Sequence, residues 1–425
     1  MRITVWGTGE TGIETAREMM RQGHEVRLVD EKEPKADPGL PVHILQKDDI
    51  LWADLVIPSP GIPRTHPLLL AAPKVLSEIE VASKLLTGTL IAITGSNGKT
   101  TTTTLIHRIL EKAGLDAGIG GNISPPLISL VQRNPRYVVA EISSFQTEWI
   151  EKFRPHIAVC LNITPDHLDR YPDMDEYVFF KKIMFKNQIA TDYAVVNDDD
   201  PYLDSLEGAA GRIGFSFTKP RSSNAGFLDG SQVCFQGSLA GKGPRIPEGP
   251  YMSRGLKEDM LASAIVARIL NIDPAVSEEV FSGFKGIHHR FEFVATISGV
   301  TFIDDSKATN VGALDTALAG MDGPVILILG GKDKGGDFSS IAQTHKKKIR
   351  KVFAIGEAGV RILNEVSGIV EAAAAADMEE AVASSFASAK SGDTVLLSPG
   401  CASFDMFRSY AHRGEVFQAC VRAIN

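Results

Sequence analysis

One stretch of the sequence decides the fold of the central part of the chain: Leu90-Ile91-Ala92-Ile93-Thr94-Gly95-Ser96-Asn97-Gly98-Lys99-Thr100-Thr101. The apolar run over 90–94 predicts a buried strand and residues 100–113 predict a helix, so a glycine-rich loop leads from a strand into a helix N-terminus. Backbone N–H groups of such a loop bind phosphate oxygens, the lysine neutralises the β- and γ-phosphates, and the next hydroxyl holds Mg²⁺. Ile93 stands where the strict motif has glycine, so the strand–loop–helix context carries the prediction. We expect ATP to contact Gly95, Ser96, Asn97, Gly98, Lys99, Thr100 and Thr101.

A second glycine turn lies near the N-terminus, where Gly7-Thr8-Gly9-Glu10-Thr11-Gly12 follows a strand over 3–6. Asp30 ends the next predicted strand, over 25–29. The pattern matches the dinucleotide-binding fingerprint, which places a phosphate at a helix N-terminus and an acid near a ribose. It does not specify a nicotinamide. An NAD-dependent oxidoreductase is therefore a rival interpretation, but it leaves the 95–101 loop unexplained.

Strand-like and helix-like stretches alternate along most of the chain, which is typical of parallel α/β sheets covered by helices. We predict three α/β domains over residues 1–88, 89–287 and 288–425. One central helix is expected over about 176–188. Residues 221–254 are rich in Gly, Ser and Pro, and the pattern fits either a small antiparallel piece or a long loop.

Polar clusters follow two predicted strands of the central domain, at 141–146 and 162–169. The carboxyl ends of strands in open α/β sheets face the ligand crevice. Glu141 therefore stands where a Mg²⁺ ligand is needed, and His167 is either a metal ligand or an ordinary loop histidine. Lys181 and Lys182 point about 100° apart on a helix, so only one can face a cleft.

Three further polar clusters follow strands of the last domain, at 304–310, 330–336 and 398–405. Small, hydroxyl and charged residues at three strand ends predict the walls of one polar pocket. Scattered helix-capping turns are the alternative interpretation.

Charge and hydropathy exclude several classes of function. The net charge of −8 argues against a nucleic-acid partner, which favours a basic face. No apolar run reaches the length needed to span a bilayer, and the N-terminus lacks the apolar segment of a signal peptide. We expect a cytoplasmic monomer with small-molecule substrates and no membrane association.

Taken in order along the chain, the motifs resemble the Mur ligases of bacterial peptidoglycan synthesis, and the resemblance covers nearly the whole chain. It implies their three-domain architecture, with Rossmann-like terminal domains around a central P-loop ATPase-like domain. It also implies an ATP- and Mg²⁺-dependent amide ligase that works through an acyl phosphate. Residues 305–310 and 398–405 resemble the branch that adds D-glutamate to UDP-N-acetylmuramoyl-L-alanine. The motifs are the 95–101 loop, Gly121-Asn122, residues 141–146, Asp166-His167, His289-Arg290 and residues 305–310.

The resemblance also implies roles for individual residues. The UDP substrate is expected at Thr11, Asp30, Gly61, Asn122 and Ser143, which explains the first glycine turn without NAD. Metal ions are expected at Thr100, Glu141, His167 and a carbamylated Lys181, with Lys182 as the fallback. His289, Arg290, Asp305 and Lys307 are expected to face ATP, and Thr309, Lys334, Ser403 and Tyr410 to form the D-glutamate pocket. The expected catalytic residues are Lys99, His167, Lys181, Arg290 and Lys307.

One segment departs from the family pattern. Where the family has His-Asn-x-x-Asn near the adenine, this chain reads Gly255-Leu256-Lys257-Glu258-Asp259, and Asp259 is the residue that could take one of those places. Two further rivals remain open: a non-catalytic UDP-sugar-binding relative, and a sister ligase with another amino-acid specificity.

Overall fold

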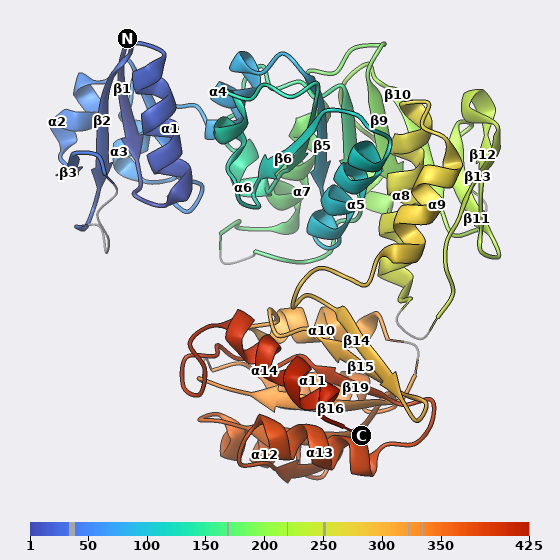
Figure 1. Ribbon diagram of the computed structural model, residues 1–425. Helices are drawn as coiled ribbons and strands as arrows, with labels where there is room; N and C mark the ends of the chain where they lie inside the picture. Colours follow the sequence, from blue (N-terminus) through green and yellow to red (C-terminus); the bar gives the residue numbers. More distant parts are fainter. Residues whose placement is uncertain are drawn as a thin grey trace. The chain divides into compact units, whose positions relative to one another are not determined.

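The computed structural model describes residues 1–33, 39–167, 170–218, 220–249, 252–321, 323–333 and 335–424. The chain divides into two compact units, Met1–Ile246 with Glu258–Ser282, and Pro247–Lys257 with Gly283–Asn425. Helices alternate with three mainly parallel sheets, so the predicted α/β class is confirmed (Figure 1). The domain limits at 88 and 287 stay predictions.

The first sheet has the order β3-β2-β1-β4, and all its strands are parallel. Neighbouring side chains on a strand point to opposite faces, and helices cover both. Ile3 and Val5 pack with residues of α1, while Trp6 packs with residues of α2 and α3. The elements are β1 (Arg2–Trp6), α1 (Glu10–Arg21), β2 (Glu25–Asp30), β3 (Val42–Ile44), α2 (Lys47–Trp52), β4 (Leu55–Pro58) and α3 (Pro67–Leu70).

The second sheet has nine strands in the order β13-β12-β11-β10-β9-β8-β5-β7-β6. It is parallel from β6 to β11 and antiparallel over β11, β12 and β13. β5 lies between β7 and β8, so the loops that follow these three strands leave the same edge of the sheet. The strands are β5 (Thr89–Thr94), β6 (Ala117–Gly121), β7 (Tyr137–Glu141), β8 (Ile157–Cys160), β9 (Tyr193–Asn197), β10 (Gly211–Ser216), β11 (Ala225–Asp229), β12 (Gln232–Gln236) and β13 (Gly241–Arg245).

In the central region, the structure corrects the predicted bounds of one helix and decides between the two interpretations of the 221–254 stretch. The helix expected over 176–188 is wrong in its bounds, because the helix ends at Lys182 and a 3₁₀ turn follows over Ile183–Phe185. Tertiary bonds fix the next segment, since Gln188 Nε2 donates to the carbonyls of Pro155 and Tyr193 at 3.1 and 3.0 Å. The 221–254 stretch contains the antiparallel strands β11–β13. The helices of this region are α4 (Glu78–Leu85), α5 (Lys99–Lys112), α6 (Ser144–Thr147), α7 (Met174–Lys182), α8 (Arg254–Ile269) and α9 (Pro274–Gly283).

The third sheet has the order β14-β15-β19-β16-β17-β18, with only β14 antiparallel to its neighbour. One face packs against α10, α11 and α12, and the other against α13 and α14. β19 lies between β15 and β16, so the three polar clusters expected after these strands start from adjacent strand ends. The elements are β14 (Glu292–Ile297), β15 (Val300–Asp304), α10 (Val311–Ala319), β16 (Val325–Gly330), α11 (Phe338–His345), β17 (Ile349–Ile355), α12 (Gly359–Val366), β18 (Glu371–Ala374), α13 (Met378–Ser388), β19 (Thr394–Leu397) and α14 (Tyr410–Arg422).

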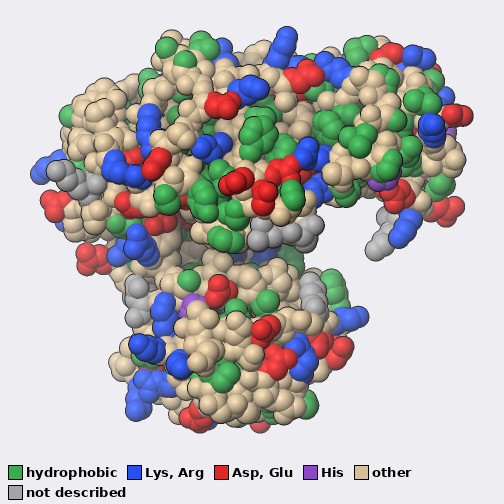
Figure 2. All heavy atoms as spheres, turned by 180° about the vertical axis from the view of Figure 1, so that it is seen from behind, with side chains coloured by type: hydrophobic (Ala, Val, Ile, Leu, Met, Phe, Trp, Pro, Cys, Tyr) green, Lys and Arg blue, Asp and Glu red, His purple; other side chains and the backbone are tan. Residues whose placement is uncertain are grey.

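The surface carries both signs of charge. On the face shown in Figure 2, basic and acidic side chains are interspersed and form no continuous basic area. Among the described residues, no helix combines the length and apolar character needed to cross a bilayer.

A buried carboxylate, Glu80, anchors α4 to the segment that follows α6. It accepts hydrogen bonds from the backbone N–H groups of Glu151, Lys152 and Phe153 at 2.7–3.1 Å, and Lys84 Nζ lies 2.8 Å away. Burial opposes the charge, but these donors hold the pKa of Glu80 below its usual value. Glu80 therefore ties α4 to residues 151–153.

We expect Glu80→Ala to destabilise the first unit by about 3 kcal/mol, because it leaves buried N–H groups without an acceptor. Trp6, Trp52 and Trp149 all lie in this unit, so urea unfolding followed by tryptophan fluorescence reports on it. Lys84→Ala, which removes only a half-exposed cation, is the control and should cost under about 1 kcal/mol. Equal losses in the two variants would contradict an anchoring role for the N–H bonds.

Candidate active site

The predicted phosphate loop lies between β5 and the N-terminus of α5. Gly98 precedes the helix with φ +84°, a conformation that side-chain-bearing residues rarely adopt. A Cβ there would lie 2.1 Å from Asp259 Oδ1, so both the backbone and the space require glycine. Lys99 Nζ curls back over the loop and donates to the carbonyls of Gly95 and Ser96 at 2.9 and 3.0 Å.

A second lysine reaches the same loop from α7. Lys181 is 2% exposed, and its Nζ donates to the Gly95 carbonyl at 2.8 Å. Burial, reinforced by the charge of Lys99, lowers the pKa of Lys181 to about 7. Lys182 points elsewhere, with its Nζ 3.4 Å from Ser205 Oγ. Of the two lysines on this helix, Lys181 is therefore the one placed at the phosphate loop.

Polar side chains from α7 and from the loop after β8 hold the phosphate loop in place. Ser96 Oγ donates to the Thr164 carbonyl at 3.0 Å and lies 2.9 Å from the Tyr177 hydroxyl. Asn97 N–H donates to Asn162 Oδ1 at 2.8 Å. Burial raises the pKa of Tyr177, so this phenol stays a neutral hydrogen-bonding group. The sequence did not point to Tyr177 or Asn162 as supports of the loop, because their partners lie far away along the chain.

Glu141 stands at the end of β7, next to the strand that leads into the phosphate loop. Its side chain is buried, and Oε1 accepts a hydrogen bond from Asn122 Nδ2 at 2.7 Å. Its other oxygen, Oε2, is buried without a hydrogen-bond partner among the described residues. A buried, unpartnered carboxylate oxygen calls for a ligand, and it suits a hard cation such as Mg²⁺.

His167 lies in the loop after β8, which leaves the same sheet edge as Glu141. Its backbone has φ +55°, and its side chain is half-exposed, with Nε2 3.5 Å from Asp166 Oδ2. The imidazole ring packs against Phe145, with ring centroids 4.7 Å apart. The structure therefore presents His167 on the phosphate-loop edge of the sheet without burying it.

The residues expected to contact the nucleotide substrate lie at several places in the first unit. Asp30 accepts hydrogen bonds from the N–H and hydroxyl of Thr8, both at 2.7 Å, and these bonds lower its pKa against the effect of partial burial. The Gly61 carbonyl accepts from Arg170 at 3.2 Å. Ser143 caps α6 together with Gln146, and Thr11 lies in the first turn of α1.

In the second unit, His289 and Asp305 lie beside the end of β15. His289 Nδ1 is 2.7 Å from Asp304 Oδ2, which raises the pKa of the imidazole although burial opposes its charge. His289 Nε2 is buried without a partner among the described residues. Asp305 accepts from Ser398 Oγ at 2.9 Å, and burial raises its pKa to about 7.

One residue that the sequence analysis missed organises this end of the third sheet. Arg413 of α14 is fully buried and donates to carbonyls at the ends of three strands: Ser306 after β15, Gly330 as the last residue of β16, and Cys401 and Ala402 after β19. Its helix also carries His412, Glu415 and Gln418, so no pattern in the sequence singled out Arg413.

The other residues predicted for this part of the chain stand around those loops. Lys307 lies over the Tyr410 ring at 5.5 Å, and Ser403 is buried. The Arg290 N–H donates to the Ile287 carbonyl at 2.8 Å, and Thr309 is half-buried. Lys334 lies outside the described residues.

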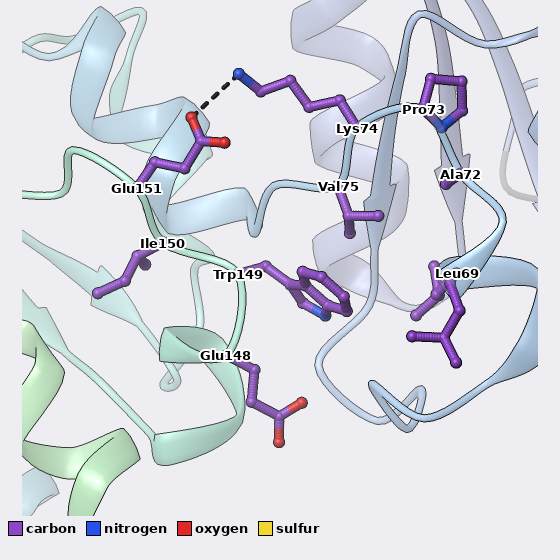
Figure 3. A pocket seen from close by; sticks show the side chains of 10 residues that line it. Leu69, Ala72, Pro73, Lys74, Val75, Glu148, Trp149, Ile150 and Glu151 are labelled. Carbon is purple, nitrogen blue, oxygen red and sulfur yellow. Dashed lines mark ion pairs between the residues drawn. The ribbon is translucent and has the colours of Figure 1, made fainter.

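A separate pocket of about 390 Å³ opens in the first unit between residues 69–75 and 148–151 (Figure 3). Leu69 and Val75 face Trp149 across it, and a Lys74–Glu151 ion pair of 3.1 Å lies at its rim. The Trp149 indole N–H is buried without a partner among the described residues. None of the ten residues that line this pocket is among the predicted site residues.

Comparison with known proteins finds relatives along nearly the whole chain. Residues 93–232 match the Mur ligase middle domain, and residues 289–401 match the Mur ligase, glutamate ligase domain. A UDP-N-acetylmuramoylalanine--D-glutamate ligase from Geobacter metallireducens is 40% identical over 442 residues, covering 99% of this chain and 97% of that protein.

Solved structures share the fold at low sequence identity. A pseudomurein peptide ligase type C from Methanothermus fervidus has a TM-score of 0.60 and 18% identity, with both chains covered completely. A MurF ligase from Thermotoga maritima in complex with ADP has a TM-score of 0.59 and 16% identity, covering 99% of this chain and 95% of that one.

Asp259, in the segment that departs from the expected pattern, contacts the phosphate loop from α8. Its Oδ1 accepts a hydrogen bond from Thr102 Oγ at 3.0 Å, and burial raises its pKa well above the usual value of 3.8. The folded protein therefore keeps a proton that the unfolded chain releases as the pH rises above about 4. The resulting stability is fully present below that pH and is lost as the pH rises towards the folded-state pKa.

We expect Asp259→Asn to remove this pH dependence, because the amide keeps an acceptor for Thr102 and does not titrate. The urea midpoint of the variant should rise relative to the unsubstituted protein between pH 5 and pH 8, measured by tryptophan fluorescence. Asp229→Asn, which changes an exposed carboxylate of the same unit, is the control and should show no such trend. If the urea midpoints of Asp259→Asn and of the unsubstituted protein changed with pH in the same way, the prediction that Asp259 is protonated in the folded protein would be wrong.

Proposed function

We propose, since the chain belongs to the Mur ligase family, that it joins D-glutamate to UDP-N-acetylmuramoyl-L-alanine at the expense of ATP. One observation carries the ATP part of the proposal: Lys99 and Lys181 both donate to the Gly95 carbonyl at the N-terminus of α5. The ammonium group of Lys99 beside a helix N-terminus creates an anion-attracting site. The named relative supports the choice of D-glutamate and of the nucleotide substrate.

The chemistry answers a simple difficulty: a carboxylate is a poor electrophile towards an amine. Transfer of the γ-phosphoryl group of ATP to the substrate carboxylate supplies a leaving group. The D-glutamate amine then attacks the acyl carbon, the tetrahedral intermediate collapses, and phosphate leaves. Lys99 offsets the negative charge that builds up when the γ-phosphate meets the carboxylate.

We propose Mg²⁺ as the cation of this site, held by Thr100, Glu141, His167 and a carbamylated Lys181. The buried, unpartnered Glu141 oxygen supports this assignment. When bound, Mg²⁺ supplies charge neutralisation of the phosphates. The lowered pKa of Lys181 leaves a large share of its amine neutral at pH 7, and only the neutral amine reacts with carbon dioxide to form a carbamate.

For the second unit we propose two groups of substrate contacts. The Nε2 atom of His289 is buried without a partner among the described residues, so it suits a hydrogen bond to a phosphate oxygen of ATP. We assign the remaining ATP contacts of this unit to Arg290, Asp305 and Lys307. Hydroxyls and a lysine suit the two carboxylates of D-glutamate, and we assign them to Thr309, Lys334, Ser403 and Tyr410. We further propose that the protein acts as a cytoplasmic monomer.

The reaction predicts which components are needed for phosphate release from ATP and Mg²⁺. Release should require both UDP-N-acetylmuramoyl-L-alanine and D-glutamate, with L-glutamate, L-alanine or no amino acid giving background rates. Release with another amino acid would keep the mechanism but assign the chain to a sister ligase. No release under any condition would favour a non-catalytic nucleotide-sugar-binding protein.

If Lys181 carries a carbamate, a small carboxylate added to the solution should restore part of the activity of a variant that lacks this lysine. Lys181→Ala should lose at least about 100-fold in turnover, because an oxygen ligand beside the phosphates is removed, and added acetate or formate should restore part of it. Lys182→Ala is the matched control and should stay active, since Lys182 points to Ser205. Full activity of Lys181→Ala without an additive would remove Lys181 from the metal site.

A further inference from the structure

Arg170 makes an unusual set of contacts three residues after His167. Its guanidinium donates to three successive carbonyls, those of Pro60 at 3.3 Å, Gly61 at 3.2 Å and Ile62 at 2.9 Å. These residues form a turn after β4, called here the 60–62 turn. The turn contains Gly61, one of the residues assigned above to the nucleotide substrate. One side chain from the β8 loop therefore holds the whole turn.

The other side of the same guanidinium is fixed by a buried carboxylate. Arg170 Nε and Nη2 donate to the two oxygens of Glu148 at 3.0 and 2.7 Å, a bidentate pair in which the side chains are 12% and 1% exposed. The Tyr171 hydroxyl donates to the same carboxylate at 3.0 Å. Figure 3 shows Glu148 on the ribbon that carries Trp149 and Ile150, opposite the ribbon that carries Leu69 and Val75. The orientation of Arg170 is thus set by Glu148, at the end of α6, and the turn is held by the same guanidinium.

The aromatic ring of Phe145 connects Arg170 to His167, one of the proposed metal ligands. The guanidinium carbon lies 4.8 Å from the centroid of Phe145, and Phe145 packs against the His167 imidazole with centroids 4.7 Å apart. The 60–62 turn, Arg170, Phe145 and His167 are therefore consecutive contacts. A change in the orientation of Arg170 must displace either the turn or the ring that supports His167.

We propose that Arg170 is a positioning residue that fixes the 60–62 turn relative to His167, so that binding of the nucleotide-sugar substrate and the geometry of the phosphoryl-transfer site are set together. The proposal rests on the proposed function for the identity of the substrate. Only arginine has a planar fork with enough donors to bind a carboxylate and three carbonyls at once, so lysine is not an adequate replacement.

Arg170→Met keeps the unbranched stem of the side chain as far as the position of Nε and removes every one of these hydrogen bonds. In the full-length enzyme we expect the KM for UDP-N-acetylmuramoyl-L-alanine to rise at least about 10-fold, the scale of one or two lost charged hydrogen bonds, and the KM for ATP to change by less than about 3-fold. Arg170→Lys should resemble Arg170→Met, and methylguanidinium should partly restore Arg170→Ala.

Arg64→Met is the matched control. Arg64 also connects the N-terminal sheet to the central region, through an ion pair with Glu176 and a contact with the Phe180 ring at 5.0 Å. It contacts neither the turn carbonyls nor Phe145, so both KM values should stay within about 3-fold of the unsubstituted enzyme. Equal rises in both KM values for Arg170→Met, or equal effects of Arg64→Met, would overturn the positioning role and leave only a loss of general stability.

A second measurement does not depend on the identity of the substrate. Hydrogen–deuterium exchange of the peptide over residues 58–66 should become faster in Arg170→Met than in the unsubstituted enzyme, while exchange over residues 100–110 stays unchanged. Unchanged exchange over 58–66 would refute the proposal even in an active enzyme. Faster exchange over 58–66 in a chain that uses another substrate would uphold the positioning of the turn and overturn only the substrate assignment.

Discussion

Two lysine side chains on one carbonyl oxygen are the arrangement on which the first unit depends. Lys99 comes from the phosphate loop itself and Lys181 comes from α7, and both donate to Gly95. Burial and the positive charge of Lys99 lower the pKa of Lys181, so Lys99 supplies the ammonium at the helix N-terminus and Lys181 supplies the amine proposed to form a carbamate. Ser96, Tyr177 and Asn162 hold the loop in place. A neutral Asp259 beneath Gly98 avoids adding a negative charge where the phosphates are expected.

In the second unit, the buried guanidinium of Arg413 binds the ends of three strands. Arg413 is buried with no carboxylate partner among the described residues, and carbonyls at three strand ends surround its guanidinium instead. Desolvation lowers its pKa to about 10, which still leaves it charged at neutral pH. Gly414, the next residue, lets α14 approach the His289–Asp304 pair, because a Cβ there would lie 2.1 Å from His289 Nδ1. The helix thus orders the loops that carry the residues assigned to D-glutamate.

Local patterns were readable from the sequence, and long-range partners were not. The phosphate loop, the first glycine turn and the strand-end clusters depend on residues within one strand–loop–helix segment, so spacing alone located them. The helix angle showed that only one of Lys181 and Lys182 could face the loop, the family resemblance favoured Lys181, and the fold places the Nζ of Lys181 on the Gly95 carbonyl. Arg170 binds carbonyls 108–110 residues away, Arg413 binds one that is 107 residues away, and a carbonyl carries no sequence signature. The end of α7 was misplaced for the same reason, since Gln188 is held by tertiary bonds.

The central claim is that the substrate carboxylate is phosphorylated before the amide bond forms. The most direct test uses UDP-N-acetylmuramoyl-L-alanine labelled with ¹⁸O in the alanine carboxylate, together with ATP, Mg²⁺ and D-glutamate. Attack of the amine on an acyl phosphate leaves one carboxylate oxygen on the departing phosphate. Mass spectrometry should therefore find one ¹⁸O atom in the inorganic phosphate for each amide bond made. Unlabelled phosphate at full amide yield would contradict an acyl phosphate and, with it, this account of the site.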